Sequence, residues 1–221
     1  MKRIEAERIE KIYGKGDAAV TAVREASFVI EAGEFAAVMG ESGSGKSTLL
    51  SIIGALNTPT SGRLTVDGVD VYALGQDERA DFRRESLGFV FQNFNLISYL
   101  TLAENVMLPL AVVRGSKRRK REMAMEALGR VGLSSKAGRL PGQVSGGEQE
   151  RVAIARAIVN SPPILLADEP TGNLDSKTGK EIMNLICALN REGMTIVMVT
   201  HNPEYARYAG KVLHVTDGVL V

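Results

Sequence analysis

The chain has 221 residues, 44% of them hydrophobic, and its 27 basic and 26 acidic residues leave a formal net charge of +1. This length suits one large domain or a domain with an inserted subdomain, and the balanced charge gives no reason to expect nucleic acid as a partner. The lone cysteine, Cys187, excludes a disulfide within the chain, which fits a reducing cytoplasm, and no apolar run approaches the roughly 18 residues of a membrane span. We therefore expect a cytoplasmic chain that reaches a membrane only through another protein.

Short apolar or alternating segments predict strands along much of the chain. The segment 34–39 (EFAAVM) is apolar without alternation, as expected for a strand of a parallel sheet that is buried on both faces. A turn at Gly14 and Gly16 separates the first two strands, and Asp67–Gly68 forms another turn. The predicted strands lie within residues 2–13, 19–35, 34–39, 62–74, 87–92, 163–168, 195–200 and 211–221.

The pattern becomes mostly helical over residues 101–160. In the helix predicted over 116–133, Met123, Ala127 and Leu128 share one face and charged residues cover the other. The order of the segments predicts an α/β core interrupted by a helical insertion. Further helices are predicted over 46–56, 148–160 and 177–193.

The segment GESGSGKST (40–48) fits the phosphate-loop pattern G-x-x-x-x-G-K-[ST], follows a predicted buried strand and opens a predicted helix. Its glycines allow backbone N–H groups to point inward around phosphate oxygens. Lys46 is placed to reach the β and γ phosphates of ATP, the Ser47 hydroxyl to bind Mg²⁺, and Thr48 to lie near the α phosphate. The nucleotide-binding residues expected here are Gly40, Ser42, Gly43, Ser44, Gly45, Lys46, Ser47 and Thr48.

Polar residues end three other apolar strands, at the sheet edge where open α/β sheets bind ligands. Asp168 is expected to hold Mg²⁺ directly or through water, and Glu169 is free to act as the general base on the attacking water. Gln92 can orient that water or contact Mg²⁺, and His201 can contact the γ phosphate. We expect Glu169, His201, Gln92 and Lys46 to form the catalytic set.

Two features of the sequence can each be interpreted in two ways. Tyr13 either packs in the sheet or stacks on adenine through its aromatic ring. In VSGGEQER (144–151), Ser145 and Glu148 have the S-x-x-E spacing of a capping box. The adjacent glycines at a helix start also resemble a backbone anion site.

Together these motifs resemble the ATP-binding subunit of an ABC transporter, over essentially the whole chain. In that resemblance Tyr13 is the adenine-stacking aromatic, and Gln92 and His201 are the Q-loop glutamine and switch histidine. The other family motifs fall at 40–48 (Walker A), 144–149 (signature), 164–169 (Walker B) and 172–175 (D-loop).

The resemblance implies a fold with a phosphate-loop NTPase core around a mostly parallel sheet, an N-terminal antiparallel β subdomain and an inserted helical subdomain. A single ABC ATPase domain would cover 1–221, with 1–92 and 161–221 forming the catalytic core and 93–160 the helical subdomain with the signature. The chain would serve integral-membrane permease subunits at the inner face of the cell membrane.

The resemblance also implies a head-to-tail homodimer around two ATP molecules. Ser145, Gly146 and Gly147 would then bind the γ phosphate of the partner's ATP, and Asp175 would lie at the seam. The signature departs from the family's usual Leu-Ser-Gly-Gly-Gln at both ends. Val144 is a small packing change, whereas Glu148 places a carboxylate near a presumed phosphate site.

Within the family, the segments around 89–110 and 167–186 resemble the lipoprotein-release and macrolide-export group (LolD and MacB). The alternative is a non-transport ATPase such as a regulator like the cell-division ATPase FtsE. Translation-type members usually carry two cassettes, and repair-type members have longer insertions than this chain has.

Two surface features also have two interpretations. An apolar set either packs in the helical core or forms a groove for a membrane partner's cytoplasmic helix. The basic run 117–121 is interpreted as a solvated helix face in preference to a lipid contact. The members of the apolar set are Phe94, Leu96, Ile97 and Tyr99.

Overall fold

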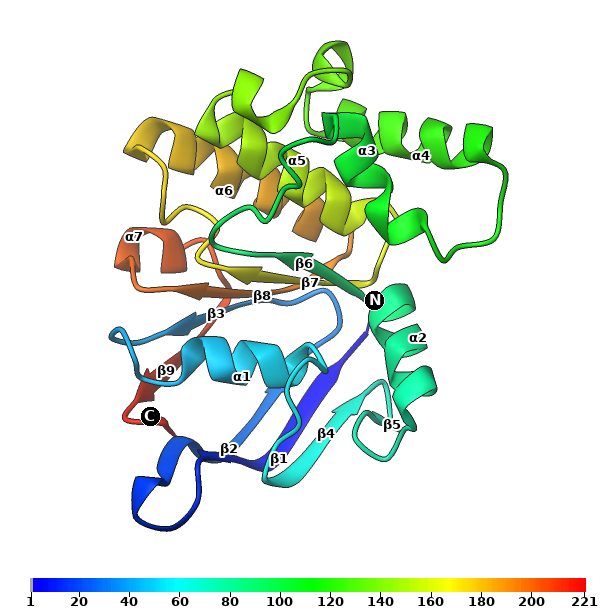
Figure 1. The fold of residues 1–221 in the computed structure, drawn as a ribbon. Coiled ribbons are helices and arrows are strands. Elements are labelled where there is room, and N and C mark those ends of the chain that lie inside the picture. The colour runs from blue at the N-terminus through cyan, green and yellow to red at the C-terminus, as the bar shows by residue number, and fades with distance from the viewer. Residues whose placement is uncertain (1) are drawn as a thin grey trace.

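A computed structural model describes residues 2–221 and contains two sheets (Figure 1). The smaller sheet has four strands in the order β2-β1-β4-β5, and the larger has six in the order β10-β9-β3-β8-β7-β6. The strands are β1 (Ile4–Tyr13), β2 (Val20–Ile30), β3 (Phe35–Met39), β4 (Ser61–Val66), β5 (Val69–Asp70), β6 (Leu87–Val90), β7 (Ile164–Asp168), β8 (Thr195–Thr200), β9 (Lys211–Thr216) and β10 (Val219–Leu220). The helices are α1 (Lys46–Ile53), α2 (Gln76–Ser86), α3 (Leu102–Met107), α4 (Lys117–Arg130), α5 (Gly146–Ile158), α6 (Ser176–Arg191) and α7 (Pro203–Ala206).

The larger sheet is parallel from β6 through β7, β8 and β3 to β9, and only the terminal β9–β10 pair is antiparallel. All pairs of the smaller sheet are antiparallel. The expected α/β class, with a mostly parallel sheet and an N-terminal antiparallel unit, is therefore confirmed. A parallel sheet needs a crossover between neighbouring strands, and helices supply those from β6 to β7 (α3, α4 and α5) and from β7 to β8 (α6).

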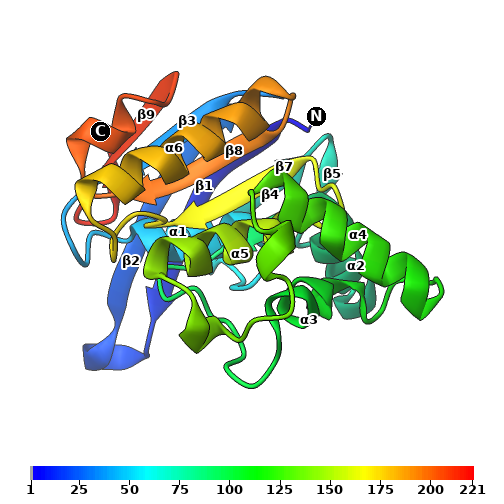
Figure 2. The ribbon, with the colours of Figure 1, turned by 90° about the horizontal axis from the view of Figure 1, so that it is seen from above.

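The central strands divide the apolar interior into two cores, one on each face of the sheet. In β3, Phe35 and Ala37 belong to the core that packs against α3, α4, α5 and α6, while Ala36 and Val38 belong to the core shared with α1 and the smaller sheet. Figure 1 shows these helices on opposite sides of the sheet, and Figure 2 shows α6 lying over β8 and β3. Both faces are buried, so the strand sequence has no polar alternation.

The helices between β6 and β7 pack on one another and on the first of these cores. Ala127 and Leu128 are buried in α4 and Met123 is partly buried, as their spacing predicts, and Ala124 is buried with them. Figure 2 shows α3, α4 and α5 side by side. Within residues 2–221, none of the helices has the length and apolar character that crossing a bilayer requires.

Sequence analysis missed α2. Its residues are mostly charged, and only Phe82 and Ser86 are buried, so the segment has no apolar stripe to reveal a helix. The helix begins after Gly75, whose N–H donates to the carboxylate of Glu78 at 2.9 Å. The bond gives the backbone N–H at the start of the helix an acceptor in the first turn.

Candidate active site

The loop between β3 and α1 is built from glycines in conformations that other residues rarely adopt. Gly43 and Gly45 have φ angles of 80° and 102°. A Cβ atom on Gly45 would lie 2.1 Å from the carbonyl oxygen of Ala22, and one on Gly40 would lie 2.1 Å from that of Val215. Because the neighbouring atoms are backbone, they cannot move aside, and the loop keeps the curled form in which N–H groups point inward.

Two polar side chains of this loop are buried within reach of a phosphate. Lys46 is only 5% exposed at the start of α1, and its Nζ donates to the carbonyl oxygen of Glu41 at 2.5 Å. The Ser44 hydroxyl is buried and has no hydrogen-bond partner among the described residues. A buried polar group without a partner costs free energy, so both side chains fit a site whose natural occupant carries anionic oxygens.

Ser47 and Asp168 meet across the sheet edge. The Ser47 hydroxyl donates to Asp168 Oδ1 at 3.1 Å. Burial raises the pKa of Asp168, while the bond from Ser47 and the nearby Lys46 charge oppose that rise. A hydroxyl and a carboxylate are hard oxygen ligands, and Mg²⁺ in such sites takes one or two protein ligands in addition to phosphate oxygens. These two residues therefore fit the predicted metal role.

Glu169 directly follows β7 in a strained backbone conformation. Its φ angle of 47° is left-handed, which costs a non-glycine residue about 1–3 kcal/mol and is concentrated at functional sites. Its side chain contacts residues that follow two other strands, β6 and β8. Its carboxylate lies 3.0 Å from His201 Nδ1 and accepts from Gln92 Nε2 at 3.4 Å.

A cleft of about 840 Å³ joins the phosphate loop to these strand ends. The sheet thus brings together residues that are more than a hundred positions apart in sequence, because the carboxyl ends of parallel strands meet at one edge. The predicted site residues that line the cleft are Gly40, Ser42, Gly43, Ser44, Lys46, Ser47, Gln92, Glu169 and His201. Tyr13, Ser145, Gly146 and Gly147 are not among its lining residues.

Tyr13 ends β1 and is 43% exposed, and Lys11 Nζ lies 5.0 Å from the centre of its ring. Asn57 Nδ2 donates to its hydroxyl oxygen. These two contacts fix the plane of the ring, and a fixed, half-exposed ring is suited to stack on a base.

The signature turn forms the capping box that its spacing predicts. Ser145 is the N-cap of α5, and its hydroxyl accepts the Glu148 N–H at 3.3 Å. The Glu148 carboxylate in turn accepts the N–H of Ser145 at 3.0 Å. Gly147 is buried, and a Cβ atom there would lie 2.3 Å from Thr178 Cγ2, so this glycine permits the close approach of α5 and α6.

Comparison with known proteins identifies the family. The family model described as ABC transporter matches residues 23–172 of the chain. The chain belongs to the ABC transporter family. It is an ABC-type ATPase, an ATP-binding subunit that hydrolyses ATP to ADP and phosphate.

Several relatives resemble this ABC ATPase along its whole length. It is 48% identical over 99% of its length to the uncharacterized ABC transporter ATP-binding protein MJ1508 of Methanocaldococcus jannaschii, of which it covers 97%. It is 47% identical to the macrolide export ATP-binding/permease protein MacB of Syntrophobacter fumaroxidans, but it spans only 31% of that longer protein. The ATP-binding cassette MJ0796, also of M. jannaschii, has been solved as a dimer in a post-hydrolysis state with ADP and Pi. That structure superposes with a TM-score of 0.90 at 44% identity, covering 98% of this chain and 96% of that one.

Sequence analysis of this ABC ATPase missed part of the cleft wall. His214, Thr216 and Asp217 of the C-terminal hairpin line the cleft. The parallel pairing of β9 with β3 places His214 opposite Met39, directly before the phosphate loop, and no local pattern in the sequence shows this pairing. Outside the cleft lining, Asn173 Nδ2 donates to the carbonyl oxygen of Gln92 at 2.9 Å.

Proposed function

We propose that this chain is the ATPase of a MacB-like or lipoprotein-release complex and that it dimerises head to tail around two ATP molecules. Each site would take its phosphate loop from one protomer and its signature turn from the other. Nucleotide binding would close the dimer, and hydrolysis would loosen it. The chain would act at the inner face of the cell membrane, where the dimer drives permease subunits.

One observation carries the proposal of shared sites. The cleft contains the phosphate loop and the polar strand ends, yet Ser145, Gly146 and Gly147 are not among its lining residues. Ser145 is nevertheless exposed at a helix start, where the first N–H groups have no partner within the helix. A second copy can bring that helix start to the cleft, and the dimeric structures of the MJ0796 cassette support this arrangement.

The geometry supports a division of roles for hydrolysis. Lys46, Ser44 and the loop N–H groups bind the phosphates, and Tyr13 stacks on adenine. Ser47 and Asp168 would hold Mg²⁺, with Gln92 as a further candidate ligand, and the ion would neutralise phosphate charge. Glu169 removes a proton from the attacking water, while His201 and Gln92 fix the direction of its carboxylate.

The decisive experiment is Glu169→Gln, which removes the base and keeps the shape. We expect turnover to fall by about 10²–10⁴-fold, while ATP still binds and produces a stable dimer on gel filtration with light scattering. Glu181→Gln is the matched control, because Glu181 of α6 forms an ion pair with Arg151 of α5 and lies outside the cleft. Normal turnover in Glu169→Gln would remove the residue from the base role. A chain that stays monomeric with ATP would contradict the shared sites.

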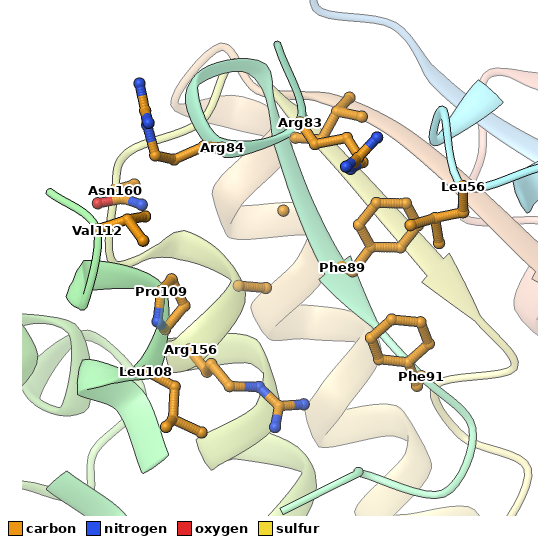
Figure 3. Close-up of a pocket in the computed structure, with 13 residues that line it drawn as sticks. Leu56, Arg83, Arg84, Phe89, Phe91, Leu108, Pro109, Val112, Arg156 and Asn160 are labelled. Atoms are coloured by element: carbon orange, nitrogen blue, oxygen red, sulfur yellow. The ribbon is translucent and has the colours of Figure 1, made fainter. Parts of the chain in front are cut away.

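An apolar hollow of about 390 Å³ is the proposed docking site of the permease (Figure 3). Phe89 and Phe91 form its floor, with rings stacked at 5.4 Å, and Leu108 and Pro109 face them from the turn after α3. The hollow is not lined by the residues that sequence analysis proposed for a groove. Those residues are Phe94, Leu96, Ile97 and Tyr99.

The charges of the hollow suggest the chemistry of its occupant. Arg83 and Arg156 line it and donate to backbone carbonyl oxygens, and neither has a carboxylate partner among the described side chains. Apolar walls with two uncompensated arginines suit an amphipathic cytoplasmic helix that carries acidic residues. We propose such a helix of the permease as the occupant.

Rebinding to membranes tests this docking site. Inverted vesicles from the native cells, stripped of peripheral proteins with urea, would be incubated with purified chain and sedimented. We expect Leu108→Glu to abolish saturable rebinding, because it places a carboxylate on the apolar wall. Tyr99→Glu is the matched control, since Tyr99 is 78% exposed and lies outside the hollow. Equal rebinding of Leu108→Glu and the unchanged chain would overturn the assignment.

A further inference from the structure

The signature turn carries a carboxylate beside residues that are proposed to bind phosphate. Glu148 lies in the first turn of α5, directly after Gly146 and Gly147. A carboxylate that faced the partner's γ phosphate would oppose the approach of the two protomers, because like charges repel across an interface. The structure shows what keeps this carboxylate away.

Both oxygens of Glu148 are bound within its own chain. Oε2 accepts the N–H of Ser145 at 3.0 Å, and Oε1 accepts from Lys136 Nζ. The two side chains are mostly shielded from solvent, at 23% exposed for Glu148 and 32% for Lys136. Partial shielding strengthens the attraction within such a pair compared with an exposed pair.

Lys136 stands on an anchored turn. It ends a short 3-10 helix, Ser134–Lys136, and the backbone that follows is bound to the start of α3. The carbonyl oxygens of Ala137 and Arg139 accept the N–H groups of Ala103 and Leu102 at 2.9 and 2.8 Å. Ala137 is also buried in the helical core. The backbone that carries Lys136 is therefore held at a defined place.

We propose that Lys136 is a positioning residue of the signature turn, which neutralises Glu148 and holds its carboxylate away from the partner's γ phosphate. The inference rests on the proposed sharing of sites between protomers. With the pair intact, the helix start presents no net charge to the incoming phosphate. Without Lys136, the same turn presents a carboxylate whose charge no cation neutralises.

The ion pair also explains how a glutamate is tolerated at this position. The bonds from Lys136 and Ser145 lower the pKa of Glu148, so the carboxyl group is charged at neutral pH and needs a fixed cation nearby. A glutamine would make the bond to Ser145 without needing that cation. Dimerisation should thus need Lys136 only because Glu148 is charged, and it should no longer need Lys136 when Glu148 is replaced by a neutral residue.

The experiment measures ATP-driven dimerisation in the Glu169→Gln background, where hydrolysis does not intervene. We expect Lys136→Met to raise the ATP concentration for half-maximal dimer about tenfold, with ATP binding to the diluted monomer unchanged. Adding Glu148→Gln to Lys136→Met should restore dimerisation. Arg118→Gln is the control for loss of one positive charge from the same part of the chain, since Arg118 pairs with Glu122 on the exposed face of α4.

Each outcome decides a separate question. If the Glu169→Gln parent forms no dimer with ATP, the shared site itself is wrong. If the parent dimerises and Lys136→Met dimerises equally well, the role of Lys136 is overturned. Failure of Glu148→Gln to rescue Lys136→Met would show that the lysine acts through packing alone, which also overturns the proposal. A thermal unfolding curve for each monomer establishes that the variants are folded.

Discussion

The two glycine-containing turns of this chain both precede a helix, yet they are built in opposite ways. The Walker A turn uses left-handed glycines such as Gly45, encloses the buried Lys46 and has no side-chain cap on α1. The signature turn begins α5 in the ordinary manner, with Ser145 as a capping residue and Gly146 already helical. One turn is an anion site within its own chain. The other is a capped helix start, and in the proposed dimer it becomes a phosphate site only when a second protomer presents its ATP.

The largest expected effect comes from an alanine in the first turn. Gly45→Ala must adopt a φ of 102° and place its Cβ atom 2.1 Å from the Ala22 carbonyl oxygen. Left-handed strain and a backbone overlap together should lower the free energy of unfolding by about 3–5 kcal/mol. Urea denaturation measures that loss, and isothermal titration with ATP should show no binding by the folded fraction.

The matching change in the second turn is Gly146→Ala. Its added Cβ atom would meet Leu174 at 3.6 Å, an ordinary contact, and the backbone is helical. The monomer should therefore be unchanged or more stable by about 0.5–1 kcal/mol. Equal losses of stability in Gly45→Ala and Gly146→Ala would show that the two turns are not built differently.

The second-largest expected effect is a pH dependence of stability, and it comes from Glu150 in α5, the helix that follows the signature turn. Glu150 is fully buried in α5 with no partner for either carboxylate oxygen among the described residues. Burial raises its pKa to about 8, although the Arg156 charge opposes the rise. The folded chain thus holds a proton that the unfolded chain releases above its ordinary pKa of about 4.5. Stability should fall as the pH rises from about 4.5 to 8.

Glu150→Gln should remove this dependence, because the amide has no proton to lose. We expect the variant to be more stable than the unchanged chain by up to a few kcal/mol at pH 8, with a smaller difference at pH 5. Thermal melts across that range measure it. Glu148→Gln provides the contrast, since the lowered pKa of Glu148 makes its contribution disappear as the pH falls. Parallel curves for Glu150→Gln and the unchanged chain would mean that Glu150 is ionised in the fold.

The same contrast explains what could be predicted from sequence. The Walker A turn and the Ser145–Glu148 box are local patterns, and the strand-end residues follow from one rule of parallel sheets. The contact of Gly147 with Thr178, the Lys136–Glu148 pair and the docking hollow join segments that have no local relation. Helix α2 was not predicted because most of its residues are charged and its few buried residues form no apolar stripe. These features depend on packing between distant segments, and the spacing of residues within one segment gives no information about that packing.

A third and smaller effect tests why the second signature glycine is present. Gly147→Ala would place its Cβ atom 2.3 Å from Thr178 Cγ2, so α5 and α6 must separate slightly. We expect a loss of about 1–3 kcal/mol in the free energy of unfolding. Thr178→Ser removes the obstructing methyl group and keeps the hydroxyl that donates to Asp175 at 2.6 Å. The double variant should recover most of the loss, and no recovery would place the strain elsewhere.

The smallest expected loss of stability is also the sharpest test of the second turn. Ser145→Ala removes the cap of α5 and should cost about 1 kcal/mol in unfolding free energy. If Ser145 also binds the partner's γ phosphate, ATP binding by the dilute monomer should survive while dimerisation and hydrolysis are lost. Ser116→Ala is the control, because Ser116 caps α4 in the same way and lies outside the cleft. Ordinary turnover in Ser145→Ala would leave this serine with the cap alone, because a phosphate ligand cannot be removed without a change in the hydrolysis that depends on it.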